Sequence, residues 1–316
     1  MDAVALGELL IDFTCTGQDT DGYPAMQAHP GGAVANFLGA MAKYGADTAL
    51  LGKVGEDAFG KLLVNTLEQA GISAQGIVTD RRYFTTLAFV TLDASGDREF
   101  SFARKPGADT KLSAQEVNYS LIDETKVFHF GTLSLTDQPA REATQTAVAY
   151  AKEKGKLITF DPNLRKPLWR CMQSCKRQLL WGLSQADVVK ISEEEVAFLF
   201  GKLTPEEGAQ YILTNFPVKL VFVTCGAEGC FYANEKASGW VGALPGVKPV
   251  DTTGAGDIFG GSAVWKLLQL GKKPEALTDA QLREITAFAC TAAGLSTQRP
   301  GGLSSVPSYE EVIAAM

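Results

Sequence analysis

The chain has 316 residues, 46% of them hydrophobic and 21% charged, and its formal net charge at pH 7 is −7. This length and balance are typical of a globular enzyme, and the negative charge without a Lys/Arg-rich run argues against a general nucleic-acid binder. No apolar run approaches the roughly 18 residues of a membrane span and no positively charged signal sequence opens the chain, so we expect a cytoplasmic protein without a membrane partner.

Strand-like and helix-like segments alternate along most of the chain. In the first half, the apolar patterns predict strands at 3–11, 48–52, 127–131 and 157–160, and helices at 32–44, 57–70 and 138–154. In the second half, they predict strands at 187–190, 219–224 and 229–233, and helices at 173–184, 193–200, 205–214, after Asp257, and at 279–296. The alternation predicts a three-layer α/β/α fold with a mostly parallel central sheet, in which ligands bind at the carboxyl ends of the strands.

Two stretches, 12–31 and 84–106, interrupt this alternation. They contain short alternating segments joined in the second case by a turn at 93–97, which favours antiparallel strands. We expect a small β-sheet built from these two insertions to act as a lid over the ligand crevice. Its exposed apolar face would pair two subunits into a homodimer. Residues 1–316 are expected to form a single domain that includes this lid.

A glycine-rich turn, Asp251 to Gly261, leads into an apolar helix that begins near Gly256. The first turn of a helix offers unpaired N–H groups and positive potential, which suit an oxyanion or a phosphate. Asp257 lies at the same position and can accept a proton from an attacking hydroxyl. The combination of an anion site and a base suggests a kinase.

Two other interpretations of this segment stay open at this point. An acid in the first helical turn also stabilises a helix without any chemistry. The spacing of Gly254, Gly256 and Gly260 approximates a dinucleotide-binding fingerprint, which would indicate a dehydrogenase. That fingerprint belongs to the first βα unit of a fold and needs an acid about twenty residues later, at the end of a second strand. Here the motif lies late in the chain, with only about sixty residues after it, and its acid, Asp257, lies inside the motif. The chain also lacks the P-loop pattern and the signatures of protein kinases.

Polar residues follow several predicted strands. Asp12 follows the first predicted strand, and Gly31, Gly32 and Asn36 lie at the start of the next helix. These residues can bind the hydroxyl groups of a polyol. Alternatively, Asp12 only caps a turn and Asn36 faces solvent. Glu195 can organise water around Mg²⁺ or complete a capping box with Ser192. Further segments of this kind are Asp161 to Arg165 and the turn from Thr224 to Gly229, which can wrap a phosphate or make a hairpin.

These motifs together match a family. Gly52 to Gly60, Asp251 to Gly261, and Gly31-Gly32-Ala33 with Asn36 make the chain resemble the ribokinase-like carbohydrate kinases of the phosphofructokinase-B group over essentially its whole length. The resemblance implies the ribokinase-like fold, and it implies ATP as phosphoryl donor with Mg²⁺. It also implies that Asp257 is the catalytic base toward a sugar hydroxyl, with the backbone of Gly254, Ala255 and Gly256 as the anion hole.

The resemblance extends to the binding residues. It implies that Asp12, Gly31, Gly32 and Asn36 bind sugar hydroxyls. It places Lys190, Glu195, Thr224, Gly226 and Gly229 along ATP and Mg²⁺. It assigns a K⁺ loop to Asp251, Thr253, Ser296, Arg299, Gly301 and Ser305. Ser192 and Cys290 stand where many relatives have asparagine, in the Mg²⁺ water network and near the adenine respectively.

Within that group, the segments around Arg104 and Arg165 are similar to those of bacterial fructokinases, which implies that both arginines reach the sugar and that fructose is converted to fructose 6-phosphate. Aminoimidazole riboside kinases, 2-keto-3-deoxygluconate kinases and ribokinases share parts of these motifs and remain alternatives. A different class of alternative is a noncatalytic sugar- or nucleoside-binding protein with the same fold.

Overall fold

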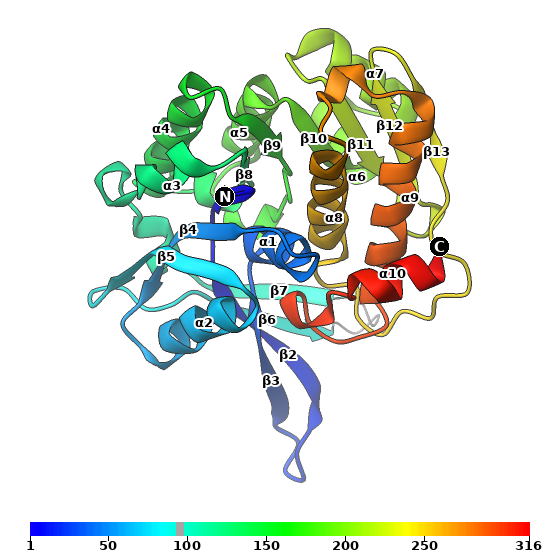
Figure 1. The fold of residues 1–316 in the computed structure, drawn as a ribbon. Helices are drawn as coiled ribbons and strands as arrows, with labels where there is room; N and C mark the ends of the chain where they lie inside the picture. Colours follow the sequence, from blue (N-terminus) through cyan, green and yellow to red (C-terminus); the bar gives the residue numbers. More distant parts are fainter. Residues whose placement is uncertain (93–97) are drawn as a thin grey trace.

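A computed structural model of the chain describes residues 1–92 and 98–316, so the turn predicted at 93–97 lies outside the described residues. Within them, the strands form a nine-stranded sheet and a separate four-stranded sheet (Figure 1). The large sheet contains β1 (Ala3–Leu6), β4 (Thr48–Gly55), β5 (Ile72–Asp80), β8 (Val127–Phe130), β9 (Leu157–Phe160), β10 (Val188–Ser192), β11 (Leu220–Thr224), β12 (Cys230–Asn234) and β13 (Ser238–Val241). The small sheet contains β2 (Leu10–Gln18), β3 (Pro24–Gly31), β6 (Leu87–Leu92) and β7 (Arg98–Ala103).

The large sheet has the strand order β13-β12-β11-β10-β9-β8-β1-β4-β5, and its strands run parallel from β5 to β11. Only β12 and β13, joined to β11 by hairpins, are antiparallel to their neighbours. The prediction of a mostly parallel sheet is therefore confirmed. Because the parallel strands share one direction, the segments that follow β1, β9 and β10 emerge at the same edge of the sheet.

Helices cover both faces of the large sheet. They are α1 (Ala33–Lys43), α2 (Ala58–Gln69), α3 (Tyr119–Glu124), α4 (Ala140–Glu153), α5 (Met172–Gln185), α6 (Glu193–Phe200), α7 (Pro205–Asn215), α8 (Ala255–Leu270), α9 (Asp279–Ser296) and α10 (Tyr309–Ala315). Alternate residues of β1 enter opposite cores: Val4 and Leu6 pack with α3 to α7, whereas Ala3 and Ala5 pack with α1, α2, α8, α9 and α10. This two-sided burial produces the predicted three layers.

One predicted strand, 3–11, is wrong because it combines two strands of different sheets. The chain leaves the large sheet after Leu6 and enters the small sheet at Leu10. The sequence does not show where the chain passes from one sheet to the other, because Leu9, Leu10 and Ile11 continue the apolar run and are all buried. The sequence prediction also omits β5, β13, α3 and α10. The strand β5 has an irregular burial pattern, and β13, α3 and α10 are short elements with only partial burial.

The small sheet consists of two antiparallel hairpins, β2–β3 and β6–β7, as the alternating segments predict. A parallel pairing of β2 with β6 joins the two hairpins and gives the order β3-β2-β6-β7. In Figure 1 the β2–β3 hairpin projects away from the helices of the large sheet. No helix in the described part of the chain is long and apolar enough to cross a membrane.

Candidate active site

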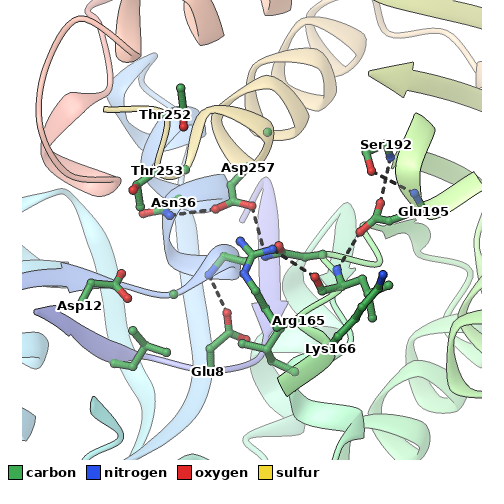
Figure 2. A pocket seen from close by; sticks show the side chains of 18 of the residues that line it. Glu8, Asp12, Asn36, Arg165, Lys166, Ser192, Glu195, Thr252, Thr253 and Asp257 are labelled. Carbon is green, nitrogen blue, oxygen red and sulfur yellow. Dashed lines mark hydrogen bonds between the residues drawn. The ribbon is translucent and has the colours of Figure 1, made fainter. Parts of the chain in front are cut away.

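A cavity of about 710 Å³ lies between the two sheets and the first turn of α8. This volume is typical of a site for small molecules. Figure 2 shows that its labelled side chains come from segments far apart in the sequence: the β1–β2 junction, α1, the loop after β9, the first turn of α6, and the turn before α8. The cavity therefore occupies the strand-end edge at which the fold predicts ligand binding.

The first turn of α8 forms one wall of the cavity. Gly254 is the N-cap residue in the left-handed conformation, with φ of 77°, which glycine adopts without steric cost. A Cβ atom on Gly254 would lie 2.9 Å from Asn36 Nδ2, and one on Gly256 would lie 2.8 Å from Lys190 Nζ. The two glycines thus let the backbone of the turn approach side chains of the site, and the first-turn N–H groups give this wall positive potential.

Asp257, in the same turn, is only 8% exposed. Its Oδ2 accepts a hydrogen bond from Asn36 Nδ2 at 2.9 Å, and its Oδ1 accepts one from Asn163 Nδ2 at 3.4 Å. Burial, with the negative charge of Asp161 nearby, raises the pKa of Asp257 to about 7 although the Asn36 hydrogen bond and Lys190 oppose the shift. A carboxylate with this pKa can accept a proton near neutral pH.

The loop after β9 contributes a buried ion pair to the site. Lys190 Nζ lies 3.1 Å from Asp161 Oδ2, and both side chains are largely buried. Burial disfavours the charge of Lys190, but Asp161, Glu195 and Asp257 outweigh it, so the pKa of Lys190 is raised and the side chain is an ammonium ion. Asn163 stands in the left-handed region with φ of 42°, a conformation that asparagine tolerates.

Glu195 joins α6 to the loop after β9. Its Oε2 accepts the N–H of Ser192 at 2.9 Å, which completes the predicted capping box, and its Oε1 accepts the N–H of Leu164 at 2.7 Å. Burial raises the pKa of Glu195, although Lys190 opposes the shift. The structural and functional interpretations of this residue are therefore compatible, because the cap itself places a carboxylate in the wall of the cavity.

Asp12 and Arg165 face the cavity from opposite sides in Figure 2. Burial raises the pKa of Asp12 to about 6, and the positive charge of Arg165 acts in the opposite direction. A Cβ atom on Gly31 would lie 2.1 Å from Asp12 Oδ2, so a larger residue at 31 would displace this carboxyl group. Asp12, Gly32, Asn36 and Arg165 together give this end of the cavity hydrogen-bonding groups suited to a polyol.

Comparison with known proteins agrees with this geometry. The model of the pfkB family of carbohydrate kinases matches residues 2–308. This chain belongs to that family. As a pfkB family carbohydrate kinase, it is 40% identical over 315 residues to fructokinase-2 of Solanum lycopersicum, covering 99% of this chain and 95% of the relative.

Two solved structures extend the comparison of this pfkB family kinase. The fructokinase of Xylella fastidiosa with bound ATP is 30% identical, with a TM-score of 0.89 over 99% of this chain and 97% of that one. A double mutant of the fructokinase from Vibrio cholerae O395, with fructose, ADP and a potassium ion bound, is 32% identical, with a TM-score of 0.87 over 99% and 98% of the two chains. These similarities show the ribokinase-like fold predicted from the sequence motifs.

Arg104, which is expected to reach the sugar, is bound by groups of the protein itself. It does not line the cavity, and its guanidinium group is held by Asp109 Oδ2, Thr136 Oγ1 and the carbonyl oxygen of Leu133, each at 2.8 Å from a nitrogen of the group. With 5% of its surface exposed, it is buried at the base of the small sheet. A direct contact of Arg104 with the sugar stays a prediction; in this structure Arg104 holds Leu133, which lines the cavity.

The expected nucleotide residues divide into two groups. Lys190 and Glu195 line the cavity, whereas Thr224, Gly226 and Gly229 do not. Thr224 is the register partner of Ser192, a cavity residue, so the turn after β11 continues from the edge of the site. Gly226 and Gly229 have φ values of 52° and 109° and shape that turn. Their contact with a nucleotide stays a prediction.

The six residues expected to surround K⁺ lie on two segments that Asp251 joins. Its Oδ1 accepts the N–H of Thr253 and its Oδ2 accepts the N–H of Gly301, both at 2.9 Å. Ser296 and Ser305 are buried and donate to the carbonyl oxygens of nearby residues. The side chain of Arg299 instead pairs with Glu311 of α10, so Arg299 can offer only its backbone carbonyl oxygen to an ion in this loop.

Asn163 and Glu8 are two of the site residues that were not among the predicted ligands. Asn163 lies within a loop that the sequence identifies as a functional segment, but its contact with Asp257 depends on the fold. Glu8 is 2% exposed, lines the cavity, and accepts the N–H of Ala33 at 2.6 Å. Burial raises the pKa of Glu8 to about 7. The sequence feature that could have identified Glu8 is its place as an acid directly before the apolar run Leu9 to Ile11.

Proposed function

We propose that this protein is an ATP-dependent fructokinase that transfers the γ-phosphoryl group of ATP to the primary 6-hydroxyl group of fructose, giving fructose 6-phosphate and ADP. The observation that carries this proposal is the buried Asp257 carboxyl group at the N-terminus of α8, held by Asn36 in a cavity of sugar size. The full-length similarity to fructokinases supports fructose as the acceptor.

In the proposed reaction, Asp257 takes the proton of the acceptor hydroxyl as its oxygen forms a bond to the γ-phosphorus. The bond from that phosphorus to the bridging oxygen breaks, and ADP leaves with the electron pair. The N–H groups of the turn at Gly254 to Gly256 stabilise the negative charge on the transferred group. Lys190, positive and adjacent to the same turn, adds charge stabilisation.

The proposal includes Mg²⁺ and K⁺. Glu194 and Glu195 offer carboxylate oxygens in the wall of the cavity, which are the donors that Mg²⁺ prefers directly or through water. When bound with ATP, Mg²⁺ would neutralise part of the phosphate charge. The loop formed by Asp251 to Thr253 and 299–305 is rich in backbone and hydroxyl oxygens close behind the N-terminus of α8. A K⁺ ion held there would add positive charge beside the anion hole.

We further propose that 1–316 acts as one kinase domain and that the small sheet is its lid. Asp12 of β2 and Phe102 of β7 both line the cavity, so the two hairpins form the sugar-side wall. Closure of this wall over the sugar would exclude water and limit ATP hydrolysis. The projecting part of the small sheet is the surface through which we propose a homodimer.

The proposal is tested by measuring ADP formation with Mg²⁺ and K⁺ in the presence of fructose, ribose, 2-keto-3-deoxygluconate or aminoimidazole riboside. We expect the highest kcat/KM with fructose and formation of fructose 6-phosphate. Preference for another compound would overturn the choice of fructose and retain a kinase. No turnover with any of them, despite binding of fructose and ATP, would favour the noncatalytic alternative.

The Asp257→Asn variant tests the mechanism in the same assay. The amide keeps the size of the side chain but cannot accept the proton, so we expect kcat to fall by at least about 10³-fold, at the upper part of the usual range for a lost general base. Asp187→Asn is the matched control, because Asp187 accepts the N–H of Ile158 at 2.9 Å away from the cavity. Near-wild-type turnover of Asp257→Asn would contradict the proposed base.

A further inference from the structure

We propose that Glu8 is a positioning residue for phosphoryl transfer: it fixes the N-terminus of α1, and through Asn36 it holds the Asp257 carboxyl group in place. This inference rests on the proposed function. It concerns a residue that touches neither the proposed nucleotide loop nor the proposed cation loop.

Glu8 stands where the chain passes from one sheet to the other. Residues 7–9 connect β1 of the large sheet to β2 of the small sheet, and 32 connects β3 of the small sheet to α1. The hydrogen bond of 2.6 Å from the N–H of Ala33 to Glu8 Oε1 joins these two connections. At Gly32, with φ of 130°, an added Cβ atom would lie 2.4 Å from the carbonyl oxygen of Glu8. The two connections are thus packed tightly against each other.

The Glu8 carboxyl group has no ion-pair partner among the described residues. The positive charge of Arg104 lowers the pKa of Glu8, but the Arg104 guanidinium group is already bound by Asp109, Thr136 and Leu133. The hydrogen bonds that offset the burial of Glu8 come from backbone N–H groups, those of Ala33 and of Glu8 itself. An unpaired carboxyl group is costly to bury, and this one lies in the wall of the cavity. A function at the site explains its presence better than a gain in stability does.

The link from Glu8 to the base is short. The N–H of Asn36 donates to the carbonyl oxygen of Gly32 at 3.0 Å, so Asn36 belongs to the same first turn that Glu8 anchors. The Nδ2 atom of Asn36 then donates to Asp257 Oδ2 at 2.9 Å. Figure 2 shows Asn36 beside Asp257, with Glu8 on the other side of the cavity. A displacement of this turn would move the Asp257 oxygen away from the acceptor hydroxyl, and small misplacements of reacting groups cost up to about 100-fold in rate.

The test compares Glu8→Ala and Glu8→Gln with the wild-type chain. The amide oxygen of Gln can still accept the N–H of Ala33, whereas Ala leaves that N–H without its partner. We expect Glu8→Ala to lower kcat by about 10–100-fold and Glu8→Gln to restore kcat to within a few-fold of wild type. KM for ATP should change less than twofold in both variants, because the first turn of α1 lies on the sugar side of the cavity.

Glu116→Ala is the control for a purely structural loss. The Glu116 carboxylate also accepts a backbone N–H, that of Ser113 at 2.8 Å, and it pairs with Lys53 away from the cavity. Its removal should lower the Tm without changing kcat. Unfolding of each variant is followed by circular dichroism, so that a loss of folded protein is not counted as a loss of rate. If Glu8→Ala does not fold, Glu8→Gln and Glu8→Asp are compared instead. The side chain introduced in Glu8→Asp is too short to reach the N–H of Ala33, so this variant should have the lower kcat.

Two outcomes would overturn the inference. One is an unchanged kcat in the variant that loses the Ala33 hydrogen bond. The other is an equal loss in Glu8→Gln, which would mean that the charge of Glu8 contacts the substrate directly. All variants are assayed with the best acceptor found for the wild-type chain. If fructose fails as acceptor but another sugar is phosphorylated, the proposed substrate falls while the inference about Glu8 is still tested.

Discussion

Asp257 combines two properties that oppose each other. Its carboxyl group is buried beside Asp161, which makes ionisation costly, yet the ionised form is the one that accepts a proton. The asparagines on either side, Asn36 and Asn163, direct donors at its two oxygens and limit that cost. The resulting pKa of about 7 lets the group exchange a proton at neutral pH.

This raised pKa predicts a stability gain when the carboxyl group is removed. The folded state binds the Asp257 proton up to a pH of about 7, against an ordinary pKa of 3.8. Folded stability is therefore highest at low pH for this group and falls as pH rises through 7. We expect Asp257→Asn to exceed the wild type in free energy of unfolding by roughly 2 kcal/mol or more at pH 8, and by less at pH 5.

Denaturant unfolding at the two pH values measures this difference. The control is Asp123→Asn, because the Asp123 side chain is 45% exposed and lies outside the cavity, so it measures the general effect of an Asp→Asn change on unfolding. A gain for Asp257→Asn that does not depend on pH would show that the carboxyl group is not held at a raised pKa.

The helix α8 carries the largest part of the predicted chemistry on its first turn. Both of its ends are glycines in the left-handed conformation, Gly254 with φ of 77° and Gly271 with φ of 60°. Only the first is constrained by neighbours: an added Cβ atom would lie 2.9 Å from Asn36 Nδ2 and 3.0 Å from Gly302 Cα, whereas nothing lies within 4 Å of one added at Gly271. Both ends of α8 share the left-handed backbone, but only a substitution at Gly254 would also crowd the site. A comparison of the two positions therefore distinguishes these two effects.

We predict that Gly254→Ala and Gly271→Ala both lose about 1 kcal/mol of stability from the left-handed backbone. Gly254→Ala should lose more than this and at least about tenfold in kcat, because the new methyl group displaces Asn36 or the turn itself. Gly271→Ala should keep wild-type kcat. Thermal unfolding and steady-state kinetics of the two variants test this, and equal activity in both would show that the turn tolerates displacement.

At the level of elements, periodicity and glycines were enough to predict α8, α9 and the parallel strands that carry the site. The resemblance of the motifs to a known family gave Asp257 and Asn36 their proposed roles. Glu8 could not be assigned from its sequence context, since its proximity to Ala33 exists only because the chain changes sheets at 7–9 and again at 32. The hydrogen bonds of Arg104 could not be predicted for a related reason: its partners Asp109 and Thr136 are held beside it only by the fold.

The whole molecule consists of a large layered body and a small sheet that is exposed on its projecting part (Figure 1). Tyr23, at the turn between β2 and β3, is 69% exposed, and Phe84, at the base of β6, is 56% exposed. Of the two, Tyr23 lies on the projecting hairpin, where a large exposed apolar side chain favours contact with another protein surface. A second copy of the chain paired through this hairpin would cover Tyr23 symmetrically.

We therefore predict that the protein sediments as a dimer at micromolar concentration and that Tyr23→Asp shifts it toward the monomer. A charge at that turn would have to be buried in the interface, which weakens association. Tyr211→Asp is the control, since Tyr211 is 44% exposed on α7 of the large body. Sedimentation velocity distinguishes these cases, and a wild-type monomer at all concentrations would exclude pairing through the small sheet.

The way in which the small sheet is attached has a consequence for how new substrates can arise in such a scaffold. Each hairpin begins and ends at almost the same place: Glu8 meets Ala33 across the β2–β3 hairpin, and Thr86 and Arg104 meet at Asp109 across the β6–β7 hairpin. The ends of each hairpin are therefore adjacent, and the two hairpins pair with each other through β2 and β6. Exchange of the small sheet as a unit would replace residues such as Phe102 in the cavity wall and leave Asp257 and α8 in place, so acceptor preference can diverge while the phosphoryl-transfer machinery is inherited intact.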